Sequence, residues 1–240
     1  MPNIRGIYDN MDKVTKAIDA LQRGEFILIH DSDDREDETD FVIAAEFVRP
    51  EHIAKMRTDG GGLICIALAG ETAKKIGLPF YTEIMDAASK KIKVLSHLKA
   101  NDIPYDEKSS FSLNMNYRGT FTGITDIDRA LTIRKFAEFL KNEGLSPEKF
   151  GSRFRSPGHV SLLISRGIEN RRGHTEFAAA MLEGASLTPV AAICELMDSE
   201  THRSLSRDKA IPYAKNNNMV FLEGGEIVRA LKTKNKIKPI

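Results

Sequence analysis

Short apolar runs recur along the chain, separated by polar or glycine-containing stretches. The runs 26–29 and 41–45 are rich in β-branched and aromatic residues, so they predict two buried strands. Four further runs predict buried strands in the same way, at 63–68, 160–165, 190–197 and 219–222. The segment 111–117 alternates apolar and polar side chains, which is typical of a half-buried strand.

Helical spacing of apolar residues separates these strands. A first helix is expected over 11–21, with Asp9 or Asn10 as its cap and Gly24 at its end. Five more helices are predicted, from Pro50 to the glycines at 60–62, over 70–77, from Thr125 or Asp126 to Gly144, over an alanine-rich stretch ending at Glu183, and over 206–216. The stretch 81–108 fits either a helix or a loop packed over the core, and the lysine-rich tail 232–240 is expected to be frayed or solvated.

The arrangement of these elements indicates the fold class. No internal repeat, low-complexity linker or change in composition divides the chain, and its 240 residues are enough to bury a substantial core. The sequence therefore predicts a single domain over 1–240 of the α+β class. In this architecture a mixed β-sheet carries helices packed on its faces, in three layers.

Composition argues against several classes of protein. Lys and Arg together number 35 and Asp and Glu 34, a net charge of +1 that gives no support to nucleic-acid or membrane binding. No apolar run approaches the length of a membrane span, and residues 1–10 lack the pattern of a signal peptide. Two cysteines, Cys65 and Cys194, lie in apolar runs, which favours buried thiols in a reducing compartment. We expect a cytoplasmic protein without nucleic-acid or membrane partners.

The stretch 31–40 between the first two predicted strands carries seven carboxylates and one arginine. Such crowding of negative charge is unfavourable unless a cation or an exposed surface relieves it. An EF-hand is excluded, because Glu36 stands where that loop requires glycine and Val42 where it requires glutamate. A solvated acidic connection is the simpler alternative, and we expect Asp31 and Asp33 to be solvated. The position of the stretch 31–40 between two core strands nevertheless favours a loop that binds a divalent metal and a substrate.

A second polar stretch, 171–175, combines two arginines, a glycine, His174 and Thr175 at the start of a predicted helix. Free backbone amides at a helix N-terminus, together with arginine and threonine, are typical of a phosphate site. A surface turn capped by Thr175 explains the same residues equally well. His159 also lies in a predicted glycine-containing loop, where functional side chains concentrate.

Several single residues allow both a structural and a functional interpretation. Glu195 lies inside an apolar strand, where an unpaired carboxylate is costly, so a functional role is favoured. Cys65 fits a buried apolar group as well as a site thiol, whereas Cys194 fits the buried group better. Asp126 and Asp128 suit the start of a helix, although a substrate role for Thr122 or Asp126 is an alternative.

An acidic loop and five further matched segments give the chain a resemblance to a known family. Asp34-Arg35-Glu36-Asp37-Glu38-Thr39-Asp40 resembles the acidic loop of 3,4-dihydroxy-2-butanone 4-phosphate synthase, an enzyme of riboflavin biosynthesis. The resemblance continues in order through the strand with Cys65, Thr122-Gly123-Ile124-Thr125 to Asp128-Arg129, Ser156-Pro157-Gly158-His159-Val160, Arg171 to Glu176, and Ile193-Cys194-Glu195. The sequence departs from the family pattern at Thr39, often glycine, at Arg172, often a small residue, and over 81–108, which is longer than in bacterial members.

The resemblance implies that D-ribulose 5-phosphate is converted to dihydroxybutanone phosphate and formate. It also implies a homodimer and two magnesium or manganese ions at each site. Glu36 and His174 would be the metal ligands, and His159 and Glu195 match positions essential for turnover. Glu38 would lie beside the reacting hydroxyls, and Cys65 would line the site. The implied substrate-binding residues are Arg35, Glu36, Asp40, Arg171, Arg172, Gly173, His174 and Thr175.

Two other functions stay open at the level of the sequence. A metal-dependent phosphosugar isomerase or phosphatase could use the same acidic loop and phosphate site, and formate release would distinguish the synthase from it. A binding protein that has lost turnover is the second alternative, against which the presence of Glu36, His159, His174 and Glu195 argues. Some family members are fused to a cysteine-rich zinc-binding module. We expect a single activity here, because the chain has too few cysteines for that module.

Overall fold

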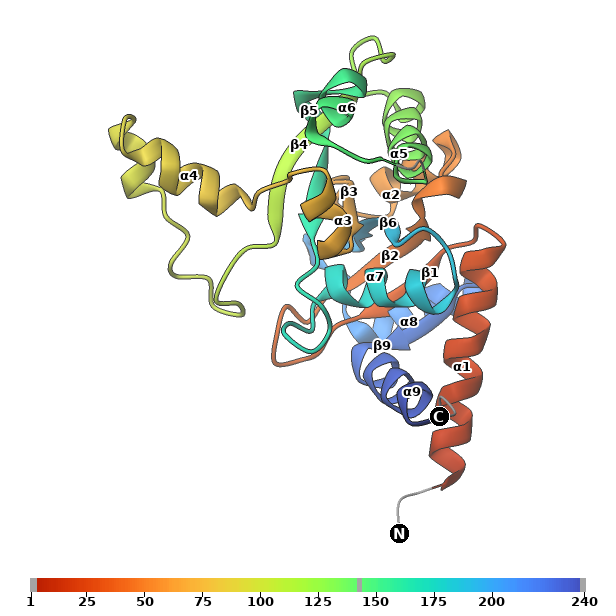
Figure 1. Cartoon of the computed structure of the whole chain (residues 1–240). Helices are drawn as coiled ribbons and strands as arrows, with labels where there is room; N and C mark the ends of the chain where they lie inside the picture. Colours follow the sequence, from red (N-terminus) through yellow and green to blue (C-terminus); the bar gives the residue numbers. More distant parts are fainter. Residues whose placement is uncertain (1–3, 142–143, 238–240) are drawn as a thin grey trace.

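A seven-stranded mixed sheet forms the centre of the molecule in the computed structural model, which describes residues 4–141 and 144–237 (Figure 1). The strand order is β4-β5-β3-β6-β2-β1-β9. Its strands are β1 (Ile27–His30), β2 (Thr39–Ala44), β3 (Cys65–Leu68), β4 (Phe111–Tyr117), β5 (Phe154–Ile164), β6 (Val190–Glu195) and β9 (Val220–Glu223). A separate hairpin pairs β7 (Met197–Asp198) with β8 (Arg203–Ser204).

The sheet combines parallel and antiparallel pairs. β1 runs parallel to β9, and β3 runs parallel to β5. The central strand β6 is antiparallel to both β2 and β3. The predicted α+β class with a mixed sheet is therefore confirmed.

One face of the sheet is covered by α1 (Ile4–Gln22), α7 (His174–Gly184) and α9 (Gly224–Ile237). Side chains from these helices, such as Leu21 and Phe177, pack on the inward residues of the central strands. Burial of one such side chain contributes about 1.5–3 kcal/mol relative to leaving it exposed. This layer matters for function because it fixes the N-terminus of α7 over the sheet.

The opposite face is covered by α2 (Pro50–Thr58), α3 (Gly70–Lys75), α5 (Asp126–Leu140), α6 (Pro147–Arg153) and α8 (Arg207–Asn216). Aromatic rings close this core at one end, where Phe136 and Phe150 pack on Phe154 with ring centroids 5.6 and 5.3 Å away. Thr125 caps α5 by accepting a hydrogen bond from the Asp128 amide, and both Asp126 and Asp128 lie in the first turn, as predicted. The two apolar layers and the sheet between them give the three-layer arrangement.

Residues 81–108 form an arm that leaves the body of the molecule as α4 (Tyr81–Ser89) and a short 3-10 helix (Lys93–His97) (Figure 1). Of the two alternatives left open for this stretch, helical structure is correct for 81–89 and 93–97, and a loop packed over the core is not. Ile92, Val94 and Leu98 have exposed fractions of 51%, 58% and 60%. The segment then returns to β4 without regular structure.

Several element boundaries differ from prediction. α1 begins at Ile4, upstream of the expected caps, and β5 begins at Phe154, so His159 lies within a strand rather than a loop. β4 pairs irregularly with β5, and Phe111 at its start is 39% exposed. The end predicted for α5 at Gly144 is also wrong, because the helix ends at Leu140 with Lys141 as its C-cap. Residues 142–143 lie outside the described part.

The C-terminal tail forms a helix where we expected a frayed or solvated segment. α9 extends to Ile237, and residues 238–240 lie outside the described part. Ile227 and Ala230 are three residues apart and bury against the α1 and α7 layer. These two residues precede the lysine-rich stretch, and Lys232 is exposed. The helix therefore contradicts the expected fraying over 232–237, and solvation of the lysines stays a prediction. Within the described residues, none of the helices combines the length and apolarity needed to cross a membrane.

Candidate active site

The acidic loop between β1 and β2 is organised around Asp31. The Asp31 side chain is completely buried and accepts hydrogen bonds from the amides of Glu36 and Glu38, both at 3.1 Å, and from Arg35 Nη1 at 2.8 Å. The prediction that Asp31 is solvated is therefore wrong, because the loop folds back and supplies main-chain donors to its carboxylate. Asp33 has an 86% exposed side chain, as expected. The loop consequently presents Glu36 and Glu38 from a fixed turn.

The start of α7 lies opposite this loop. Gly173 is the cap, His174 is the first helical residue, and Thr175 is 3% exposed, so the alternative of a surface turn capped by Thr175 is wrong. Buried Glu176 accepts hydrogen bonds from Arg171 Nη1 and from the Arg166 amide, at 2.5 and 2.9 Å. This carboxylate anchors the 171–175 stretch against the body of the protein.

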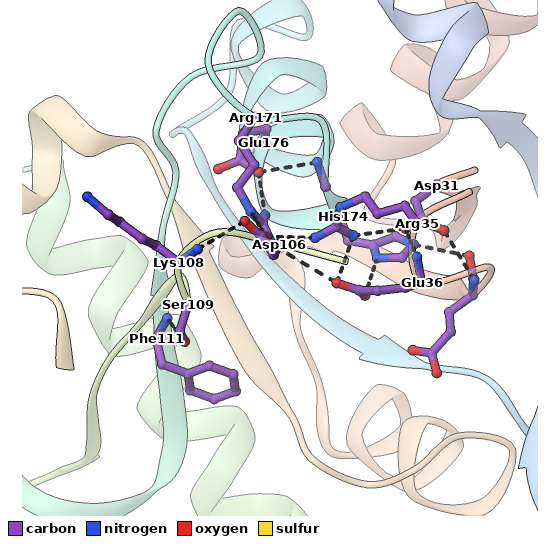
Figure 2. A network of polar contacts seen from close by, with 12 residues as sticks. Asp31, Arg35, Glu36, Asp106, Lys108, Ser109, Phe111, Arg171, His174 and Glu176 are labelled. Atoms are coloured by element: carbon purple, nitrogen blue, oxygen red, sulfur yellow. Dashed lines mark hydrogen bonds and ion pairs between the residues drawn. The ribbon is translucent and has the colours of Figure 1, made fainter. Parts of the chain in front are cut away.

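His174 lies at the centre of the cluster formed by the two stretches (Figure 2). Its Nδ1 is 3.4 Å from Glu36 Oε2, and its Nε2 is 3.2 Å from the Glu38 carbonyl oxygen and 3.7 Å from Asp40 Oδ1. Asp40 Oδ1 is buried and has no hydrogen-bond partner. The loop and the helix thus converge on one imidazole from different parts of the chain.

A divalent cation fits this cluster. Asp31, Glu36 and His174 each offer a ligand atom, and these atoms lie within 4.8 Å of one another. Carboxylate oxygens suit magnesium and manganese, and one imidazole is compatible with both ions. Asp40 Oδ1 has no hydrogen-bond partner and lies 3.7 Å from His174 Nε2, so it is a further carboxylate oxygen available beside these ligands. The donor set therefore matches the predicted ligands Glu36 and His174, with Asp31 as an unpredicted third candidate.

The pKa shifts in the cluster follow from burial and crowding. Burial alone lowers the pKa of His174, but the carboxylates of Asp40, Glu36 and Asp31 outweigh it and raise that pKa to about 10. Burial raises the pKa of Asp40 well above its ordinary value, despite the neighbouring imidazolium. Burial, with help from Glu36, also raises the pKa of Glu38. The cluster is therefore able to hold protons as well as a cation.

Sheet register brings Glu195 and Cys65 below this cluster. Asp40 on β2 is paired with Glu195 on β6, and Cys65 on β3 is paired with Ile193 of the same strand. Because side chains alternate along strands, Asp40, Glu195 and Cys65 share the sheet face that α7 covers. Burial raises the pKa of Glu195, and it raises the pKa of the Cys65 thiol well above its ordinary value.

Cys194 points to the opposite core, where its Sγ lies 3.4 Å from the Met56 carbonyl oxygen. Burial raises the pKa of this thiol to about 12. The interpretation of Cys194 as a buried apolar group agrees with this environment.

His159 lies outside the cluster. Strand β3 separates its strand, β5, from β6 with Glu195, so the two residues are on the order of 10 Å apart across the sheet. The His159 side chain is exposed, and its Nδ1 is 3.1 Å from the Asn116 amide nitrogen. The family resemblance grouped His159 with the other candidate residues. Within one chain, the structure does not place His159 in the cluster around His174.

Arg35 and Arg171 flank the cluster and share Asp106, which the sequence analysis did not single out (Figure 2). Asp106 lies in the stretch whose pattern was least interpretable, so nothing in the sequence marked it. Exposed Arg172 lines a cavity of about 850 Å³ together with both arginines and Asp106. Asp126, a weaker candidate, instead pairs with Arg57 and Arg129 outside the cluster.

The acidic loop and the start of α7 place candidate cation ligands next to arginines, a combination suited to a metal-dependent enzyme with an anionic substrate. Residues 15–230 match the family model of 3,4-dihydroxy-2-butanone 4-phosphate synthase. The chain belongs to that family of enzymes, which confirms the resemblance stated from the sequence motifs.

Relatives and solved structures agree with this assignment. The chain is 48% identical over 219 residues to 3,4-dihydroxy-2-butanone 4-phosphate synthase of Methanothermobacter thermautotrophicus, covering 90% of this chain and 95% of that relative. Identity to the same enzyme of Archaeoglobus fulgidus is 45% over 218 residues, covering 89% of this chain and 91% of that relative. A crystal structure of a 3,4-dihydroxy-2-butanone 4-phosphate synthase in complex with two magnesium ions superimposes with a TM-score of 0.74 at 27% identity, covering 92% of this chain and 97% of that one.

Proposed function

We propose that the chain converts D-ribulose 5-phosphate to 3,4-dihydroxy-2-butanone 4-phosphate and formate in riboflavin biosynthesis, with magnesium or manganese. The observation that carries this proposal is the convergence of the acidic loop and the α7 N-terminus on His174, in a chain of this family. The reaction requires proton removal next to a carbonyl, a carbon shift and hydrolytic loss of formate. Each step needs charge stabilisation and a positioned proton carrier.

Glu36 and His174 are the proposed metal ligands, and Asp31 is close enough to join them. We expect two ions at the site, as in the magnesium complex of the structural neighbour. A bound cation would supply charge stabilisation for developing oxyanions. Around it, Arg35 holds Glu36 Oε1 at 2.7 Å, and Asp40 lines the floor of the site on β2.

Proton transfer is assigned to Glu38 and Glu195. Both carboxyls have a raised pKa, chiefly because of burial, so each can exchange a proton closer to neutral pH than an exposed carboxyl does. Cys65 lies on the same sheet face, where burial raises the pKa of its thiol, and we propose that it lines the site. His159 is the third proposed catalytic group. Its separation from Glu195 within one chain is the reason to consider a site shared between two copies of the chain.

The phosphate end of the substrate is assigned to the 171–175 stretch. The first turn of α7 provides the backbone amides of His174 and Thr175, because the Gly173 amide already donates to Glu176. Arg35, Arg171 and Arg172 line the adjoining cavity. Arginine forks grip a phosphate bidentately, and Thr175 adds a hydroxyl. Binding energy from this remote group would position a small, flexible sugar at the cluster.

We propose a homodimer whose interface lies near His159. Asn116 contacts His159 and also donates to the Thr122 carbonyl oxygen in the loop 120–125. On and after this loop, Phe121, Ile124 and Ile127 have exposed fractions of 93%, 51% and 67%. An exposed apolar patch next to a polar candidate residue supports burial by a second copy of the chain.

Formate release tests the proposed function. Purified protein is incubated with D-ribulose 5-phosphate and magnesium, and formate and the four-carbon phosphate are quantified. We expect both products in equal amounts with magnesium and neither after chelation. Isomerised sugar phosphate without formate, or free phosphate, would support the isomerase or phosphatase instead. No chemical change despite ligand binding would support a binding protein.

A further inference from the structure

Asp106 places one carboxylate oxygen between the two arginines that border the candidate site (Figure 2). Its Oδ2 accepts hydrogen bonds from Arg35 Nη2 at 3.1 Å and from Arg171 Nε at 2.5 Å. The Asp106 side chain is only 12% exposed, and the two arginine side chains are 11% and 13% exposed. An anionic oxygen bound by two guanidinium groups resembles a bound phosphate oxygen in its chemistry.

The remaining guanidinium contacts bind the arginines to the protein itself. Arg35 Nη1 contacts Asp31 and Glu36, and Arg171 Nη1 contacts Glu176. Arg171 Nη2 lies 4.0 Å from Glu36 Oε1. Both arginines and Asp106 line the 850 Å³ cavity, together with Arg172 and Lys108. A phosphate group entering this cavity meets donors that Asp106 already uses.

Asp106 lies on a segment with few attachments. Between Leu98 and Ser110 the described chain forms neither helix nor strand. Arg166 anchors its end by donating to the Lys108 and Ser109 carbonyl oxygens at 2.8 and 2.7 Å. On the other side, the Tyr105 ring lies against Arg35, with its centroid 5.5 Å from Cζ. Asp106 can therefore leave the arginines without disrupting a helix or a strand of the sheet.

We propose that Asp106 is a specificity-determining residue, which occupies the position of the ligand's phosphate group and is displaced when that group binds. The identity of the phosphate-bearing ligand rests on the proposed function. Exchange is expected rather than joint binding, because phosphate and Asp106 would be like charges at the same donors. A phosphate dianion has three acceptor oxygens and more charge than Asp106, so it displaces this carboxylate where a monoanion does not.

Inorganic phosphate is the probe that tests this exchange. Its dissociation constant is measured by calorimetry, with magnesium present throughout, for the wild type and for Asp106→Asn. The amide keeps the size of the side chain and removes its charge, so we expect phosphate to bind roughly tenfold tighter or more. Asp102→Asn, an exposed position on the same segment, is the matched control and should bind phosphate like the wild type.

Hydrogen exchange of the wild type gives a readout that needs no variant. Phosphate should increase amide exchange over 98–110, because the segment loses its attachment to Arg35 and Arg171. Unchanged or slower exchange with bound phosphate would overturn the proposal, as would equal or weaker phosphate binding by Asp106→Asn.

The formate assay separates this proposal from the proposed function. Formate release by the wild type with no effect of Asp106→Asn on phosphate binding would overturn the exchange alone. Tighter phosphate binding without formate release would support the exchange and reject the synthase reaction.

Discussion

His174 shows how one side chain can serve two charge states. The surrounding carboxylates raise its pKa to about 10, which favours the imidazolium form in a metal-free site. A metal ligand must be deprotonated, so cation binding has to release this proton. The proton and the cation thus compensate the same buried negative charge. His174 can therefore form an ion pair when the site is metal-free and act as a ligand when a metal is bound.

Replacement of Glu36 by glutamine tests the ligand assignment directly. Glu36→Gln keeps the size of the side chain and removes the charge that lies next to His174. We expect manganese affinity to fall at least tenfold, by about 1.4 kcal/mol or more, and formate release to be lost. Manganese binding is measured by electron paramagnetic resonance titration, and thermal unfolding verifies the fold.

Asp34→Asn is the control for this variant, because Asp34 is an exposed member of the same loop. It should bind manganese like the wild type. Wild-type manganese affinity in Glu36→Gln would remove Glu36 from the ligands.

At the scale of elements, the sequence was most informative where local pattern decides the structure. Apolar runs located the strands at 26–29 and 41–45, and the acidic loop between them proved to border the candidate site. The inward turn of Asp31 was not predictable, because its partners include main-chain amides that carry no sequence signature. α9 was missed for a related reason, since its stability comes from packing against α1 and α7.

The organisation of the acidic loop predicts the effect of Asp31→Asn. Burial opposes ionisation of Asp31, but the charge of His174, the Arg35 donor and the backbone amides outweigh it and lower its pKa. A depressed pKa contributes stability above the unfolded-state pKa, and this contribution is lost as the pH falls through the folded-state value. We expect the variant to unfold about 1–3 kcal/mol more easily at pH 7, because an amide cannot accept all of these donors.

Urea unfolding measures this difference at pH 7 and again below about pH 4, near the pKa of an unperturbed aspartate. The difference in unfolding free energy between the wild type and Asp31→Asn should be smaller at the acidic pH than at pH 7. If the two proteins unfold with the same free energy at pH 7, or differ equally at both pH values, the role of Asp31 in holding the loop is contradicted. Asp34→Asn, an exposed substitution in the same loop, should match the wild type.

At the scale of the whole molecule, the site depends on strand order that a single sequence does not encode locally. Asp40, Glu195 and His174 meet because β2 pairs with β6 and α7 crosses the same face. Only the family resemblance grouped these residues, and it also grouped His159, which the sheet order keeps apart from Glu195. The exposed apolar residues beside His159 support a homodimer, in which a second copy of the chain would lie next to this histidine.

Complementation between two inactive variants tests whether the homodimer shares its site. If a partner's His159 completes the cluster that holds Glu195, a mixed dimer of His159→Ala and Glu195→Gln contains one intact site and one doubly altered site. Random mixing gives about half mixed dimers, so formate release should recover to about a quarter of the wild-type rate. Phe121→Asp, which places a charge in the exposed apolar patch, should abolish this recovery and halve the mass measured by light scattering from twice 26.7 kDa.

Ile211→Asp is the matched control, because Ile211 is 40% exposed on α8, outside the patch beside His159. It should leave both the mass and the complementation unchanged. A monomeric wild type would reject the dimer itself. A dimer whose variants never complement would place His159 and Glu195 at the same site within one chain, and the distance across β3 would then have to be closed by the substrate.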